Sequence, residues 1–94
     1  MAEQLFGKYA GRVIDNRDPQ ALGRVKVAVP SIDTLQLNWA LPCVPYVGPG
    51  AGSCAVPPTD ALIWIEFEQG DANRPIWSGC FWGEGDPPRV VMPD

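Results

Sequence analysis

Two stretches of the chain alternate apolar and polar positions with a period of two, the pattern of a β-strand with one buried face. They cover residues 24–30 and 61–68. The residues expected to face the core are Val25, Val27, Val29, Ile63, Ile65 and Phe67. Because a slip of one residue would turn each of these sets toward solvent, we expect the register of both strands to be well fixed.

Three further strands are predicted with weaker patterns. Residues 7–14 alternate approximately, and residues 75–82 carry large side chains on both faces. Residues 39–47 are apolar but are interrupted by Pro42 and Pro45. Proline cannot donate a backbone hydrogen bond, so a strand in this segment must be short or lie at a sheet edge.

The segments between the strands carry the residue types of turns and loops. Residues 15–19 read Asp-Asn-Arg-Asp-Pro, and residues 70–73 read Gly-Asp-Ala-Asn, a sequence suited to a hairpin. The glycine-rich residues 48–53 predict a flexible loop, and we also interpret residues 31–38 as a loop. Residues 84–94 are predicted to form an extended tail without a core of its own.

The number and spacing of these strands predict the fold class. The chain has 94 residues, with 46% hydrophobic and 19% charged residues, which is a globular balance for one domain. Eleven prolines and ten glycines leave little room for helix. Short strands with many turns indicate a small barrel or sandwich, and an all-β, five-stranded Greek-key barrel with irregular termini is the simplest solution.

The sequence offers no convincing catalytic constellation. Histidine is absent, which removes the usual general base, the usual metal ligand and the common nucleophile pairs. Carboxylates occur close together at Asp15 and Asp18 and at Glu66 and Glu68. The first pair fits turn chemistry, and the second lies on a strand face turned away from the predicted core. We therefore predict no enzymatic activity, no cofactor and no metal site.

The three cysteines, Cys43, Cys54 and Cys80, form no CxxC motif. We interpret them as small buried apolar residues. A disulfide between Cys43 and Cys54 remains an alternative, and the odd count leaves at least one thiol unpaired.

Aromatic side chains exceed what a thin barrel core needs, with four Trp, two Tyr and three Phe. Exposed aromatic residues on a barrel can stack single-stranded nucleic acid, but such sites also need a positive groove. The chain has a net charge of −4 and scattered basic residues, so a protein interface is favoured and nucleic-acid binding is the alternative. Leu62, Trp64 and Trp77 are the predicted interface residues, because Trp64 points away from the core face of its strand.

Two sequence blocks carry a resemblance to a known family. Residues 11–27 read Gly-Arg-Val-x-Asp-Asn-x-Asp-Pro-x-x-Leu-Gly-Arg-Val-Lys-Val, and residues 63–76 read Ile-x-Ile-x-Phe-Glu-x-Gly-Asp-x-x-Arg-Pro-Ile. Together with Trp39-Ala40 between them and Gly79 after them, they resemble the OB-fold domain of the phage baseplate assembly protein V family. VgrG spike proteins of type VI secretion and the spikes of related contractile injection systems share this domain.

The resemblance implies a five-stranded OB-fold barrel over residues 7–83, preceded by an extension (1–6) and followed by the tail (84–94). It implies a structural homotrimer in the central spike, between tail-tube or hub proteins and a tip or β-helix protein. The assembled tail or baseplate would be its location after synthesis in the bacterial cytoplasm, with no nucleic-acid partner and no direct membrane anchoring.

Two departures from the family pattern stand out. Thr59 occupies a position where glycine is common, which predicts a slightly different turn. In addition, only eleven residues follow Gly83, where family members usually continue into a needle. We expect either an excised domain or a short spike whose tip is a separate protein.

Overall fold

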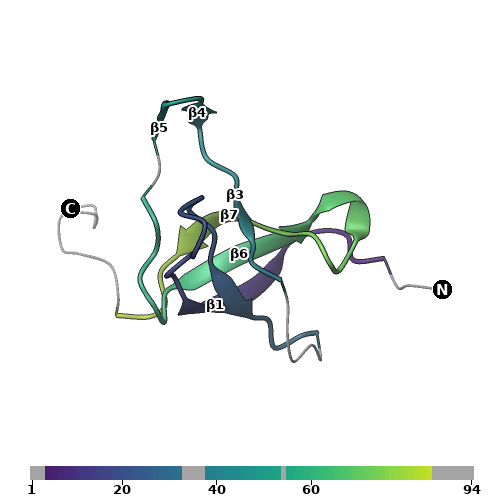
Figure 1. Cartoon of the computed structure of the whole chain (residues 1–94). Helices are drawn as coiled ribbons and strands as arrows, with labels where there is room; N and C mark the ends of the chain where they lie inside the picture. Colours follow the sequence, from purple (N-terminus) through teal and green to yellow (C-terminus); the bar gives the residue numbers. More distant parts are fainter. Residues whose placement is uncertain (1–3, 33–37, 54, 86–94) are drawn as a thin grey trace.

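The computed structural model describes residues 4–32, 38–53 and 55–85 (Figure 1). Within these residues the chain forms short strands and a single turn of 3-10 helix. These elements are β1 (Tyr9–Asp15), β2 (Lys26–Ala28), β3 (Leu41–Pro42), β4 (Tyr46–Gly48), β5 (Ala51–Ser53), β6 (Leu62–Phe67), η1 (Glu68–Gly70) and β7 (Pro75–Phe81).

Five of the strands form one curled sheet in the order β2-β1-β6-β7-β3. The pairs β1–β2, β1–β6 and β6–β7 are antiparallel, whereas β3 runs parallel to β7. An antiparallel bridge between Val25 and Ala40, with N–O distances of 3.2 and 2.8 Å, joins the two edges of the sheet. This strand order with its one parallel pair confirms the predicted all-β OB-fold barrel.

The barrel interior is built from the residues that the alternation predicted. Val25, Val27, Val29, Ile63, Ile65 and Phe67 are all buried, together with Leu5, Val13, Ala40 and Trp77. β-branched side chains suit this interior, because they pack well on a pleated surface and have few rotamers to lose. Gly11 is buried among them, and a Cβ there would lie 2.9 Å from the Ala28 carbonyl oxygen, so β1 packs too closely for a larger residue.

Two predicted segments have different bounds in the structure. The strand expected over residues 24–30 is reduced to the three residues of β2, beside an irregularity in β1 between Val13 and Asp15. The flexible loop predicted over residues 48–53 is wrong, because β4 and β5 form an antiparallel hairpin there. The edge position predicted for residues 39–47 is confirmed by β3. The interior of the predicted 31–38 loop, Cys54 and most of the 84–94 tail lie outside the described residues.

The turn after β1 is organised by one carboxylate. Asp18 accepts hydrogen bonds from the backbone N–H groups of Gln20, Leu22 and Arg24, at 2.9, 2.9 and 3.2 Å. It also accepts bonds from Nε and Nη2 of the Arg24 side chain, at 3.0 and 2.7 Å. These side-chain bonds from Arg24, and then the backbone bonds, hold the pKa of Asp18 well below its usual 3.8, although desolvation opposes them.

Candidate protein interface

The outer face of β6 and β7 carries an apolar cluster. Leu62 and Trp64 are half-buried and alternate with the buried core residues of β6. Leu62 lies opposite Phe81 in the register of the two strands. The rings of Trp64 and Phe81 are in contact, with centroids 4.4 Å apart and planes tilted by 34°. Strand pairing therefore gathers three large apolar side chains outside the barrel, and the described residues leave each of them partly exposed.

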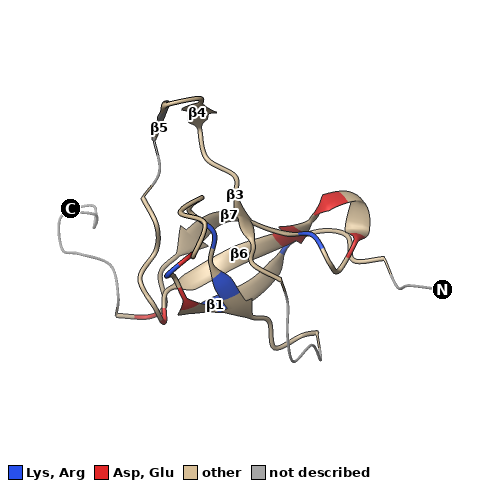
Figure 2. Cartoon of the chain, in the orientation of Figure 1, with Lys and Arg blue, Asp and Glu red and all other residues tan. Residues whose placement is uncertain are grey.

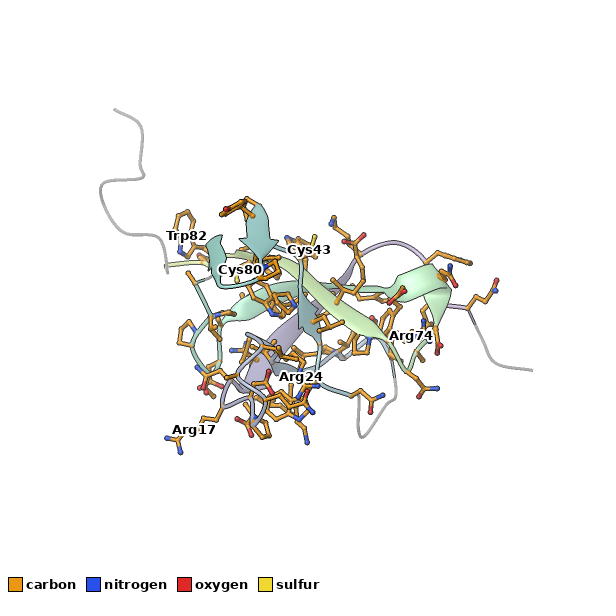
Figure 3. All side chains as sticks on the ribbon, turned by 45° about the horizontal axis from the view of Figure 1, so that its top comes forward. Arg17, Arg24, Cys43, Arg74, Cys80 and Trp82 are labelled. Carbon is orange, nitrogen blue, oxygen red and sulfur yellow. The ribbon has the colours of Figure 1, made fainter. Side chains whose placement is uncertain are left out.

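An apolar groove of about 580 Å³ adjoins this cluster. It is lined by Ala55, Val56, Pro57, Pro58, Ala61, Leu62, Cys80, Phe81 and Trp82. None of these lining residues is charged, and Trp82 is 54% exposed. Figure 3 shows Trp82 and Cys80 near each other at the end of β7. A groove of this composition suits contact with another apolar protein surface.

The structure separates the three predicted interface residues. Leu62 lines the apolar groove, and Trp64 lies beside it through its contact with Phe81. Trp77 was expected outside the core, but it lies in the barrel interior at 5% exposure. Its indole Nε1 donates a hydrogen bond to the Gly23 carbonyl at 2.9 Å, which satisfies the one polar atom of the side chain. Trp77 is therefore a core residue and is excluded from the candidate interface.

A bulge in β7 decides which of its side chains face the barrel interior. Ile65 pairs with Trp77, whereas the preceding Trp64 pairs with Gly79, so Ser78 is an extra residue. The insertion reverses the inward and outward positions beyond it. Trp77 therefore points into the barrel and Phe81, four residues later, points out, although simple alternation places them on the same face. Phe81 was not among the predicted interface residues, because residues 75–82 carry large side chains on both faces and alternation singled out none of them. The aromatic pair at 81–82 was the sequence signal that could have found it.

A small polar network borders the cluster at the other end of β6. Lys8 Nζ donates hydrogen bonds to Glu66 Oε1 at 3.1 Å and to Ser78 Oγ at 3.2 Å. The hydrogen bond from Lys8, followed by that involving Ser78, lowers the pKa of Glu66. These exposed charges give the apolar cluster a polar rim, as is common at protein interfaces.

Comparison with protein families agrees with this architecture. Residues 9–82 match the family model described as the type VI secretion system/phage-baseplate injector OB domain. The chain belongs to this family. A search of curated proteins returned no match. Family membership gives the injector OB domain a structural, baseplate-type role and associates it with tails and baseplates, and the family is not known to be enzymatic.

OB folds in general bind oligonucleotides and oligosaccharides on the face of their second and third strands. In this chain Lys26 lies in β2, and Trp39 comes shortly before β3. Arg24 Cζ and Lys26 Nζ lie 5.6 and 5.3 Å from the centroid of the Trp39 ring. A hollow of about 370 Å³ is lined by Arg24, Trp39, Arg74 and their neighbours. An aromatic ring among cations is the feature that would favour the nucleic-acid alternative.

The two arginines on this face lie next to acids. Arg24 is bound to Asp18, and the guanidinium of Arg74 lies 3.6 Å from Glu68 Oε2 and 3.8 Å from Asp71 Oδ2. Figure 2 shows basic and acidic positions interleaved on the ribbon, without a continuous basic stripe along the described strands. Among the described residues of this face, basic and acidic side chains are therefore interspersed.

The cysteines of the injector OB domain differ from prediction. Cys43 and Cys80 are exposed free thiols, whereas the sequence predicted small buried residues. Partial burial still raises the pKa of the Cys80 thiol. The alternative disulfide involves Cys54, which lies outside the described residues.

The described part of the chain holds neither a cluster of metal ligands nor a helix that could span a membrane. In the ranges 4–32, 38–53 and 55–85, no three His, Cys, Asp or Glu side chains come together as metal ligands would. Over the same ranges, none of the helical structure has the length and apolar character of a membrane span.

Proposed function

We propose that this chain is a non-enzymatic structural component of the central spike or baseplate hub of a contractile phage tail or a VgrG-like injection system. It forms a homotrimer in the assembled spike, linking tail-tube or hub proteins to a piercing tip or β-helix protein. The apolar groove with the adjoining Trp64–Phe81 pair carries the proposal. These large apolar side chains lie on the outside of a barrel whose family builds injectors.

The exposures of the side chains support an assembly surface. Trp82 and Val56 in the groove are 54% and 41% exposed, although burying a large apolar side chain contributes about 1.5–3 kcal/mol. A single exposed apolar residue is ordinary on a protein surface, but several around one groove mark a contact site. We infer that the groove is covered when the chain is assembled.

Replacing Trp64 by glutamate tests the proposal. Trp64→Glu removes an aromatic side chain at the edge of the groove and introduces a charge that association would desolvate. We expect self-association to weaken by about tenfold or more, since a loss of only 1.4 kcal/mol has that effect. Light scattering and sedimentation velocity over a concentration series measure the change.

Leu22→Glu is the matched control, because it adds the same charge at a side chain that is 52% exposed in the turn after β1. This variant should associate like the unmodified chain. Circular dichroism should show that both variants keep the fold. Equal association of the Trp64→Glu variant and the unmodified chain would contradict the proposed surface.

The nucleic-acid alternative has a direct test. Because Arg24 and Arg74, which line the hollow at Trp39, lie next to carboxylates, titration with single-stranded oligonucleotides at low salt should leave the tryptophan fluorescence unchanged. A fragment of a known OB-fold single-strand binder provides the positive control. Saturable quenching that disappears as salt is added would favour the alternative function.

A further inference from the structure

The β4–β5 hairpin forms an arm, defined as residues 46–53, that belongs to a sheet of its own. Its strands pair only with each other in the described structure, from Tyr46 opposite Ser53 to Gly48 opposite Ala51. Figure 1 shows the arm standing away from the curled sheet. Tyr46 and Val47 on the arm are 62% and 64% exposed. The arm therefore presents apolar side chains to solvent at a distance from the core.

The arm has little to stabilise it within one chain. A two-stranded hairpin by itself is marginally stable in water, and hairpins normally rely on a third strand or a packed face. Within the arm, Val47 lies over Gly52, where a Cβ would come within 3.1 Å of Val47 Cγ1. Glycine offers no side chain for Val47 to pack against, so an external surface would contribute most of the arm's packing.

The arm and one wall of the apolar groove come from a single uncharged stretch. Residues 43–59 contain no Asp, Glu, Lys or Arg, although the chain has eighteen such residues and a net charge of −4. The stretch forms the arm and then Val56, Pro57 and Pro58 of the groove. Two copies of an acidic chain repel each other, and they approach best where both surfaces lack charge.

We propose that the arm of one copy docks in the apolar groove of a second copy, through Tyr46 and Val47. The arm ends at Ser53, and the groove lining starts at Ala55. The arm therefore extends from the wall of its own groove, and in the assembly it reaches the groove of a neighbouring copy. Arm and groove are different patches, so the contact is head-to-tail, and it closes into a ring when the rotation between copies permits. This inference rests on the proposed function, which requires several copies to assemble.

A mixed cross-linking experiment tests the contact, because Cys80 lies in the groove. The groove variant, Cys43→Ser/Cys54→Ser, retains Cys80 as its thiol. The arm variant adds Cys80→Ser and Val47→Cys, so that its thiol is on the arm. We expect a short bismaleimide to join one groove variant to one arm variant in a mixture. A pH near 8 is chosen because burial raises the pKa of the Cys80 thiol.

The control replaces Val47→Cys in the arm variant by Leu22→Cys, at an exposed side chain outside the arm and the groove. Docking should give more than about tenfold faster cross-linking than this control, because it raises the local thiol concentration far above that in free solution. Circular dichroism should confirm that each variant is folded.

The outcomes separate this inference from the proposed function. Equal cross-linking of arm and control variants, with the unmodified chain oligomeric in light scattering, would overturn the arm contact and leave the proposed assembly intact. Equal cross-linking with a chain that is monomeric at every concentration would contradict both. Preferential cross-linking that disappears when Tyr46→Glu is added to the arm variant would support the contact.

Discussion

Ile65→Ala is expected to lower the free energy of unfolding by about 2–5 kcal/mol, the range for truncating a large aliphatic side chain in a packed core. Ile65 is 0% exposed in the middle of β6. It pairs with Tyr9 of β1 on one side and with Trp77 of β7 on the other. Small domains have a total stability of about 5–15 kcal/mol, so this loss removes a large part of it.

Urea denaturation followed by tryptophan fluorescence measures the effect. Ile14→Ala is the matched control, because Ile14 is 54% exposed on β1 and its truncation should change stability by less than about 0.5 kcal/mol. A loss below about 1 kcal/mol for Ile65→Ala would show that the barrel collapses around the missing atoms and that the interior is not tightly packed.

Asp18→Asn should destabilise the domain through the turn after β1. The Asp18 side chain is 4% exposed and accepts bonds from three backbone N–H groups and from the Arg24 guanidinium. An amide accepts through one oxygen only, and it leaves the Arg24 charge, with its side chain 17% exposed, without a carboxylate. We expect a clear drop in the urea midpoint, and a much smaller one for Asp15→Asn, where the carboxylate accepts one bond, from the Arg17 N–H.

The contribution of Asp18 to stability can also be measured from the pH dependence of unfolding. Hydrogen bonds from Arg24 and the backbone depress the pKa of Asp18 in the folded chain below its usual 3.8. The unfolded chain therefore binds the proton more readily, so this stabilisation is present above pH 4 and is lost progressively as the pH falls below that value. The urea midpoint of the unmodified chain should fall more steeply below pH 4 than that of Asp18→Asn. Parallel curves would show that Asp18 is not the responsible group.

Alternation of apolar and polar residues predicted the buried side chains correctly where the strands of this barrel are regular. The alternating apolar positions of residues 25–29 and of β6 are buried, since an extended segment presents every second residue to one face. Alternation gave no face for residues 75–82, and Trp77 was wrongly predicted to lie outside the core, because the bulge at Ser78 depends on how β7 pairs with β6. Pairing is a property of the folded sheet, so counting along β7 alone could not reveal it.

The arm and the Asp18–Arg24 pair were missed for different reasons. The glycines of residues 48–53 suggested flexibility, yet Pro49 followed by Gly50, which has φ +69°, is also the sequence of a tight turn between strands. The ion pair of Asp18 with Arg24 depends on the path of the turn, which brings together residues six positions apart.

Closure of the barrel by the single pair Val25–Ala40 has a mechanical consequence. The strand that leads into the arm, β3, is two residues long and is held to the described barrel by this bridge and by β7. A force pulling on the β3 side of the arm therefore acts first on a few hydrogen bonds, those of the Val25–Ala40 pair and those between β3 and β7. β1 and β6 are held by longer ladders. We therefore expect a neighbour that pulls on this side of the arm to separate β3 from the barrel before it disturbs the pairing of β1 with β6.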